Sequence, residues 1–582
     1  MDNFSVIEPG EARAEAGELP IVDVSRRHLP TLTDAAWDAL VLANDPIRFF
    51  LRSGVLTRLD QDEAGNHFFQ ALNLDRLTSI MARIAQWEKI LADGSAVSVF
   101  PLPQVIRDML AVPDSRLPWV DALSETPVLT PQGRILSHPG YDQESRIFLR
   151  SKFQIRPVPE RPSKEEIGQA VDWINEPLTD FPFESSADKA HAVALFLLGF
   201  VRPYIKGPTP LHLLDAPTPG SGKSLLAEVL LSPSHGTNKG IVAAANDDDE
   251  WRKRLSAQFR EGRPVVNVDN VRRPLDSGTL AAALTATTWE DRLLGSTEMI
   301  RVPVRCVWVA TGNNVVISTE LARRTVRIRL DPKVETPEDR EGFRHPRLLE
   351  WVAEHRTDLV WAALTLIQAW LVEGKPKLKT AAPLGSFEEW SNIIGGILEV
   401  AGINGFLKNR RELYLESDFE GQAWRAFVAE WWDQYGSRSV KTPELFVVAD
   451  TIDGLPLGNG NEQSRKTSLG KRLASMRGRI IGGFRITRAG SGHGGSILWN
   501  LISSPGSETT PPTPPSHTEQ ELEPFSSGGG TGGVSRTPTI PTRTPPSESV
   551  DNQGPGGHGG VGGVKNHLAG ENDFLTGDPG RS

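Results

Sequence analysis

Cysteine is almost absent from this chain: its 582 residues include one, Cys306. A single thiol cannot close an internal disulfide or build a cysteine zinc cage, so a reducing, cytoplasmic compartment is expected. Long apolar runs are missing too. The strongest run, Ala192–Val201, is about half as long as a bilayer span and predicts a buried helix. The acidic N-terminus lacks a signal-peptide pattern, and no membrane contact is expected.

Positive charge is in deficit as well, because 63 Lys and Arg face 73 Asp and Glu, for a net charge of −10. This balance excludes a uniformly basic nucleic-acid binder. Any contact with nucleic acid must come from a local basic patch, so charge segregation along the chain becomes the informative feature.

Composition and hydrophobic periodicity divide the chain into six segments. In chain order they are a flexible leader (1–40), an accessory α/β region (41–156), a core of alternating strands and helices with preceding helices (157–335), a helical region (336–415), a basic module (416–502) and a tail rich in Pro, Gly, Ser and Thr (503–582). The tail has too few apolar residues to offset the entropy of ordering, so disorder is expected there.

The accessory region shows a mixed pattern. Strands expected over Phe49–Leu59 and Asn66–Leu72 flank a polar turn and predict a hairpin. A helix is expected over Leu74–Leu91. Asp60 and Asp62 have the spacing of a metal-binding pair, but their position in a hairpin turn favours an ordinary turn.

Strand-like and helix-like segments alternate through the core, a pattern typical of an α/β fold with a parallel sheet. The expected strands are Leu211–Leu214, Ile241–Ala245, Pro264–Asp269, Val304–Thr311 and Thr325–Leu330. The helices expected in the core are Ser163–Glu176, Asp188–Ile205, Lys223–Leu231, Asp248–Glu261 and Ser277–Thr287. In the helical region that follows, the main expected elements are Leu349–Val372 and Ser386–Val400.

Residues 215–225, DAPTPGSGKSL, link the first of these strands to its helix. A Gly-rich bend followed by Lys and Ser at a helix start surrounds phosphates with backbone N–H groups, so the core is expected to be a P-loop ATPase. Lys223 should offset phosphate charge, and the Ser224 hydroxyl should ligate Mg²⁺. Proline at position 217 replaces the usual first glycine, and a chance linker is the alternative interpretation. The expected ATP-binding residues are Pro219, Gly220, Ser221, Gly222, Lys223, Ser224 and Leu225.

An apolar strand ending in Asp269 predicts the second ligand of the magnesium shell, with an ordinary strand-end acid as the alternative. The next residue is Asn270, where many hydrolytic P-loop enzymes have glutamate. An amide can orient water but cannot take its proton. A base must therefore come from elsewhere, with Glu250 or Glu290 as candidates, or hydrolysis is slow.

Two further motifs complete the expected catalytic set. Asn313 or Asn314, at the tip of the next strand, should read the γ-phosphate or position water. Arg323 or Arg324 should reach the γ-phosphate of a neighbouring subunit, since a planar cation stabilises the transition-state charge. The alternative is a plain surface pair. If one of these arginines does reach a neighbouring subunit, the protein works as a ring.

Together the motifs resemble the AAA+-like superfamily 3 helicases, in particular the helicase half of phage-, plasmid- and poxvirus-type primase-helicases of mobile elements. The matching segments are DAPTPGSGKS at 215–224, VDNV at 268–271, ATGNN at 310–314 and LARR at 321–324. The resemblance implies a hexameric ring, a helical lid, and a hairpin over Trp289–Val304 that grips single-stranded DNA through Arg292 and Arg301. No primase is visible, so a separate primase or replication partner is expected.

The basic module shows the charge segregation sought above, because no Asp or Glu stands between Glu462 and Glu508. Its pattern of helix Ser468–Met476 and strands Arg479–Arg488 and Ser496–Ile502 predicts a winged helix that binds DNA. The alternative is a basic face docked on the acidic body of the ring. The expected DNA contacts are Arg465, Lys466, Lys471, Arg472, Arg477, Arg479, Arg485 and Arg488.

Two functions remain in competition. The first is an ATP-dependent DNA helicase or translocase that acts on single-stranded or forked DNA. The second is a DNA-binding, ATP-dependent switch or loader with slow hydrolysis, which Asn270 favours. A small-molecule kinase ranks last because the sequence displays no acceptor pocket.

Overall fold

The computed structural model describes residues 19–25, 28–63, 65, 67–151, 153–236, 240–292, 299–458, 460–491 and 497–504. Nearly all of the tail expected to be disordered (503–582) lies outside these residues, as does half of the leader (1–40). None of the helices within these ranges is long and apolar enough to cross a membrane.

The core is a five-stranded parallel sheet, as predicted. Its strands are β12 (Leu211–Ala216), β13 (Ile241–Ala243), β14 (Val265–Val271), β17 (Val307–Asn313) and β18 (Thr325–Arg329), in the spatial order β13-β14-β17-β12-β18. Because all five run in the same direction, their carboxyl ends meet at one edge of the sheet. Polar groups that follow these strands therefore gather at that edge.

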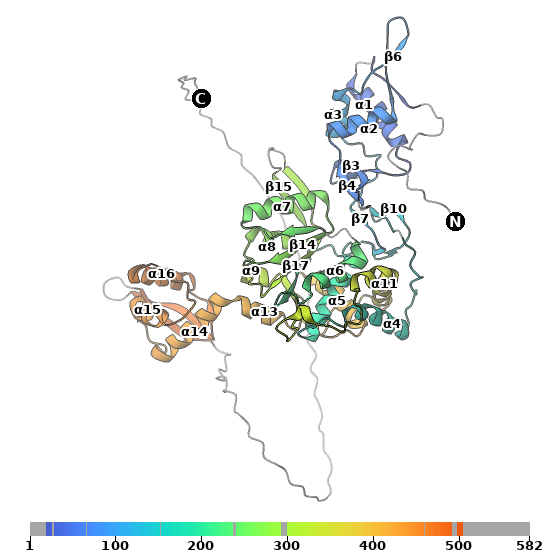
Figure 1. Cartoon of the computed structure of the whole chain (residues 1–582). Coiled ribbons are helices and arrows are strands. Elements are labelled where there is room, and N and C mark those ends of the chain that lie inside the picture. Colours follow the sequence, from blue (N-terminus) through green and yellow to red (C-terminus); the bar gives the residue numbers. More distant parts are fainter. Residues whose placement is uncertain are drawn as a thin grey trace, which may run out of the picture. The chain divides into compact units, whose positions relative to one another are not determined.

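Each face of this sheet carries its own helices (Figure 1). Alternate residues of β12 separate the two cores: Leu214 faces one and Leu213 the other. The first core is formed with α4 (Lys164–Asn175), α5 (Ser186–Val201), α6 (Lys223–His235), α11 (Arg356–Val372) and α12 (Glu388–Val400); the second with α7 (Asp248–Glu261), α8 (Gly278–Thr285) and α9 (Thr319–Ala322).

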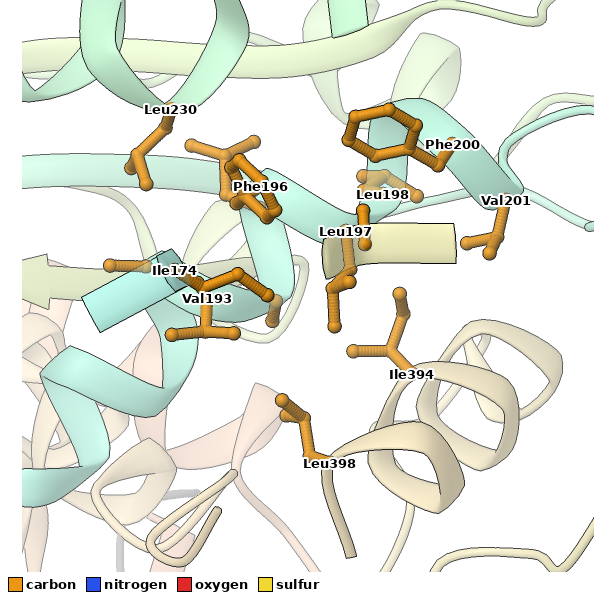
Figure 2. Packing of buried hydrophobic residues seen from close by; sticks show 14 of the residues in the cluster. Ile174, Val193, Phe196, Leu197, Leu198, Phe200, Val201, Leu230, Ile394 and Leu398 are labelled. Carbon is orange, nitrogen blue, oxygen red and sulfur yellow. The ribbon is translucent and has the colours of Figure 1, made fainter. Parts of the chain in front are cut away.

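Helix α5 is buried on every side, as its apolar sequence predicts. Figure 2 shows Val193, Phe196 and Leu197 of α5 among side chains of the neighbouring helices, including Leu230 of α6 and Ile394 of α12. This central helix fixes α6, and hence the loop that precedes α6, against the sheet.

His191 joins α5 to two other segments of the core. One ring nitrogen, Nδ1, lies 2.7 Å from the Arg327 carbonyl oxygen, and the other, Nε2, accepts the Leu407 N–H at 3.0 Å. Nδ1 therefore carries the proton and the ring is neutral. Burial lowers the pKa of His191 from 6.5 to about 4.

This histidine predicts a loss of stability in mild acid. The unfolded chain takes up the proton near pH 6.5 and the folded chain only near pH 4, so the His191 contribution is complete above pH 6.5 and declines as the pH falls towards 4. The thermal midpoint should drop between pH 7 and 5, and less steeply in His191→Gln. His138→Gln, which removes an exposed histidine, is the control, and its thermal midpoint should follow the pH profile of wild type. Identical pH profiles for wild type and His191→Gln would refute this assignment.

The N-terminal part corrects two predictions. Within the expected leader, β1 (Ile21–Asp23) and α1 (Leu29–Leu42) are ordered, because α1 buries apolar residues such as Trp37 at helical spacing. The helix expected over Leu74–Leu91 ends earlier: α2 covers Leu74–Ile84, and β5 (Gln86–Ile90) then pairs with β1. Pairing with a strand from far along the chain overrides local helix propensity there.

The predicted hairpin is present as β3 (Val55–Gln61) and β4 (His67–Ala71). The first expected strand was too long, because Ser53 and Gly54 adopt positive φ values and turn the chain between β2 (Phe49–Arg52) and β3. The remaining elements of this part are β6 (Ala96–Ser98), α3 (Pro103–Ala111), β7 (Ala122–Ser124), β8 (Val128–Leu129), β9 (Ile135–Leu136), β10 (Gly140–Asp142) and β11 (Ile147–Leu149).

The expected helix Leu349–Val372 is in fact two helices, α10 (Leu348–Glu354) and α11, separated at His355. After α12, the chain forms α13 (Arg410–Ser417) and then enters the basic module. The short 3₁₀ helices η1 (Glu176–Leu178) and η2 (Pro337–Asp339) complete the region around the core.

The basic module has its own core, built around Trp424, Leu469 and Trp499. Its elements are α14 (Phe419–Tyr435), β19 (Val440–Lys441), α15 (Thr442–Asp450), α16 (Glu462–Ser475), β20 (Ile480–Ile481), β21 (Phe484–Ser491) and β22 (Ile497–Ser503). Helix α16 begins six residues before the predicted Ser468, because the Asn461 side chain caps it. A turn at Gly482 and Gly483 splits the first expected strand.

Candidate functional site

The loop between β12 and α6 is shaped by two glycines. Gly220 and Gly222 have φ values of +73° and +85°, and Gly222 is the N-cap of α6. A Cβ at Gly220 would lie 2.5 Å from the Glu338 carboxylate, and one at Gly222 would lie 3.3 Å from the Phe181 ring. The positive φ values therefore favour glycine at both positions, and a Cβ at Gly220 would also have to displace the end of the Glu338 side chain. The loop leaves the first N–H groups of α6 without intrahelical partners, which suits an anion.

Lys223 is the first residue of α6 and is 9% exposed. Its ammonium Nζ donates to the Thr218 carbonyl oxygen of the same loop at 3.2 Å. Burial lowers the pKa of Lys223, while the nearby Asp215 carboxylate opposes that shift. The cation is thus held inside the curve of the loop.

Ser224 and Asp269 meet at the carboxyl edge of the sheet. The Ser224 hydroxyl donates to Asp269 Oδ1 at 3.2 Å, and the Thr311 hydroxyl donates to the same oxygen at 2.5 Å. Two hard oxygen ligands fit Mg²⁺, whose neighbouring octahedral ligands lie about 2.9 Å apart. The serine and the carboxylate therefore suit the metal shell expected from the sequence, and Thr311 is an additional partner of Asp269.

Asn270 follows Asp269 with a positive φ of 55°, and its backbone N–H donates to the Thr311 hydroxyl at 2.9 Å. Its side chain is exposed. The other candidate bases are held by cations: Glu250 pairs with Arg254 at 2.8 Å, and Glu290 pairs with Arg301 at 3.1 Å. None of the hydrogen bonds or ion pairs found in the described residues links either glutamate to Ser224 or Asp269.

The two asparagines after β17 lie beside the loop. Asn313 is exposed and is the register partner of Ala216 at the end of β12. The Asn314 N–H donates to the Ala216 carbonyl oxygen at 3.0 Å, and its side-chain Nδ2 lies 3.5 Å from the Pro217 carbonyl oxygen. The structure thus brings Asn313 and Asn314 to the phosphate loop.

Arg323 and Arg324 lie at the opposite edge of the sheet. The Leu211 N–H, at the start of β12, donates to the Arg324 carbonyl oxygen. The length of β12 separates this point from the phosphate loop, roughly 17 Å. The Arg323 side chain is 62% exposed, whereas that of Arg324 is 13% exposed and also donates to the Glu320 carbonyl oxygen. Of the two guanidinium groups, that of Arg323 is the more exposed, and it lies 3.6 Å from the Glu320 carboxylate.

Residues that sequence reasoning missed surround the loop. A cavity of about 440 Å³ opens beside Gly220 and Gly222, with Phe181 and Phe343 in its lining. These aromatic residues lie far from the loop in sequence, and no local motif marks them. Arg329, at the end of β18, was also missed: its guanidinium pairs with Asp215 and donates to Asn314 Oδ1.

The candidate DNA contacts fall into two groups, according to whether an acidic residue of the chain holds them. β15 (Thr288–Arg292) and β16 (Met299–Pro303) form the antiparallel pair expected over Trp289–Val304, with Arg301 paired to Glu290; residues 293–298 lie outside the described residues. In the basic module, Arg465 pairs with Asp450, Lys466 with Glu462 and Arg472 with Glu420. Among the described residues, no ion pair involves Lys471, Arg477, Arg479, Arg485 or Arg488.

No known protein family and no curated protein matches this sequence. Among solved structures, the C-terminal region of NrS-1 is 10% identical, covering 80% of this chain and 98% of its own, at a TM-score of 0.39. The SCCmec type IV Cch helicase is 12% identical (78% and 91% covered, TM-score 0.33), and the JCV helicase 16% identical (46% and 65%, TM-score 0.20). These TM-scores are too low for the likenesses to support a conclusion about this chain.

Proposed function

We propose that this chain binds and hydrolyses Mg²⁺-ATP to drive movement on DNA, as a helicase or translocase of the superfamily 3 type that acts in replication of a phage, plasmid or integrated mobile element. The observation that carries the proposal is the arrangement at the start of α6. Lys223 lies inside a glycine-shaped loop, and the next residue, Ser224, contacts Asp269 at 3.2 Å. A triphosphate with a magnesium ion fits this set of charges.

The nucleoside would occupy the cavity beside Gly220. Its volume of about 440 Å³ and the Phe181 and Phe343 rings suit the apolar faces of a base. The phosphates would then extend along the loop towards Lys223.

Within that arrangement each side chain has a separate task. Ser224 and Asp269 would hold a magnesium ion, which would neutralise charge on the phosphates. Lys223 offsets the remaining negative charge, and Asn313 and Asn314 orient the γ-phosphate or the attacking water. Arg323 lies at the edge of the sheet remote from the phosphate loop of the same chain, so it cannot serve that loop. It would instead supply a further cation to the site of a neighbouring protomer. This division of labour requires a ring, which we propose is a hexamer.

DNA would contact the β15–β16 hairpin and the basic module. The module's element order, with α16 as third helix followed by β21 and β22, supports a winged helix. The basic residues that have no ion pair within the described part of the chain are Lys471 of α16, Arg477 and Arg479 of the turn, and Arg485 and Arg488 of β21. Their positive charges are therefore available to phosphate groups.

Replacing Lys471, Arg477, Arg485 and Arg488 by Gln should weaken DNA binding. For each phosphate group that the variant no longer neutralises, the log–log salt dependence of binding should flatten by roughly 0.9 on duplex DNA and roughly 0.7 on single-stranded DNA. Fluorescence anisotropy with single-stranded and forked DNA at several salt concentrations measures both quantities. The control replaces Arg465 and Arg472, which have in-chain acidic partners. Equal slopes for the quadruple variant and wild type would assign this surface to protein contacts instead.

The second candidate function, a DNA-binding switch or loader with slow hydrolysis, is favoured by Asn270 and by the cation-bound state of Glu250 and Glu290. An ATPase assay with and without single-stranded DNA, combined with a strand-displacement assay, separates the two. Strong stimulation with displacement is the result expected for the helicase. Tight ATP binding with negligible turnover in the presence of DNA would favour the switch.

A further inference from the structure

We propose that Arg329 is a positioning residue for nucleotide discrimination: by bridging Asp215 and Asn314, it turns the amide NH₂ of Asn314 towards the phosphate loop. The inference rests on the proposed ATPase function and assigns a role to a residue outside its motifs. Arg329 ends β18, which neighbours the loop strand β12, so its guanidinium lies in the same subunit as the phosphate loop.

The inner end of this bridge is a buried carboxylate. Asp215 is 3% exposed, its Oδ2 pairs with Arg329 Nη1, and its Oδ1 accepts the Val315 N–H at 3.1 Å. Burial raises the pKa of Asp215, and the positive charge of Arg329 opposes that shift. This ion pair holds the guanidinium of Arg329, which is 19% exposed, against the buried carboxylate.

The outer end of the bridge is the Asn314 amide. Arg329 Nη2 donates to Asn314 Oδ1 at 3.0 Å, which leaves the Nδ2 group 3.5 Å from the Pro217 carbonyl oxygen of the phosphate loop. An arginine can only donate, so it selects the amide orientation in which the oxygen faces inward. The NH₂ donor then faces the side where phosphate oxygens, which only accept, would lie.

A purely structural role for Arg329 makes a different prediction. The Arg329 guanidinium also lies 3.5 Å from the Glu184 carboxylate, and the backbone N–H of Arg329 donates to the Asp188 carboxylate at 2.8 Å. If Arg329 served only to hold these segments together, its replacement would affect all nucleotides equally. If Arg329 acts through Asn314, the loss falls on nucleotides whose terminal phosphate reaches Asn314.

The test compares the binding of a non-hydrolysable ATP analogue and of ADP, with magnesium, to the full chain. Arg329→Lys keeps a cation for Asp215 but lacks the second arm of the fork. Arg329→Lys should weaken the binding of the ATP analogue about tenfold, as expected for one hydrogen bond to a charged group, and should leave the binding of ADP unchanged. Asn314→Ala should have the same effect, and the double variant should be no worse than Asn314→Ala alone. Glu184→Gln serves as the matched control.

The contrary outcomes are distinct. Equal losses for ATP analogue and ADP in Arg329→Lys, or losses that add in the double variant, would overturn the positioning role while leaving the nucleotide site intact. A wild-type chain that binds neither nucleotide would overturn the proposed ATPase itself. Thermal melts of each variant show whether a loss reflects unfolding, and Arg329→Lys avoids the unpaired buried carboxylate that Arg329→Ala would leave.

Discussion

Lys223→Ala should reduce ATP turnover about 100-fold or more, since removing one preorganised group that stabilises transition-state charge has costs of that order. The ammonium lies inside the loop, 3.2 Å from the Thr218 carbonyl oxygen, at the position where the β- and γ-phosphates are expected. Alanine fits the start of α6 and preserves the glycine bend. The fall in turnover should therefore result from the missing positive charge and not from a change in the loop. Steady-state phosphate release with saturating magnesium measures it.

The control for this experiment is Lys253→Ala. Lys253 is exposed on α7 and pairs only weakly with Glu250, so its removal changes net charge by the same amount without touching the loop. Turnover by this variant should match wild type. Unreduced turnover in Lys223→Ala, with the protein folded, would exclude this loop from catalysis.

Mixing Arg323→Ala with wild type should suppress activity far more than dilution does. Arg323 is 62% exposed at the sheet edge remote from its own loop, so in a ring it would serve the neighbouring site. If one defective protomer stops a ring of six, an equimolar mixture retains about 2% of the activity, against about half for independent sites.

The matched control is Arg252→Ala, since Arg252 is also exposed and pairs with an acid three residues away. Arg324→Ala is a poor substitute: that side chain is 13% exposed and held by Glu320, so its loss perturbs the local fold. Activity that falls in simple proportion to the fraction of Arg323→Ala would argue against a shared site.

Local patterns were enough to predict the five parallel strands and the loop. The short apolar run of β12, which is buried along its whole length, and the helix that starts at Lys223 are properties of neighbouring residues, which a sequence shows directly. The meeting of Ser224 with Asp269 was predictable as well, because parallel strands place their carboxyl ends at one edge. The strand order itself depends on non-local pairing.

Features that depend on distant contacts were missed. Asp215 and Arg329 are 114 positions apart, and neither belongs to a motif that marks the other. The cavity beside Gly220 joins Phe181, before the sheet, to Phe343, after it. Similarly, β5 pairs with β1 from the far side of α1 and α2, which explains why its residues were mistaken for helix.

The most direct test of the proposed nucleotide site is equilibrium titration of the full wild-type chain with a fluorescent ATP analogue, in magnesium and in EDTA. We expect saturable binding that unlabelled ATP displaces, that weakens when magnesium is removed, and that Lys223→Ala abolishes. Absence of saturable binding, or equal binding by wild type and Lys223→Ala, would contradict the assignment of this loop to ATP.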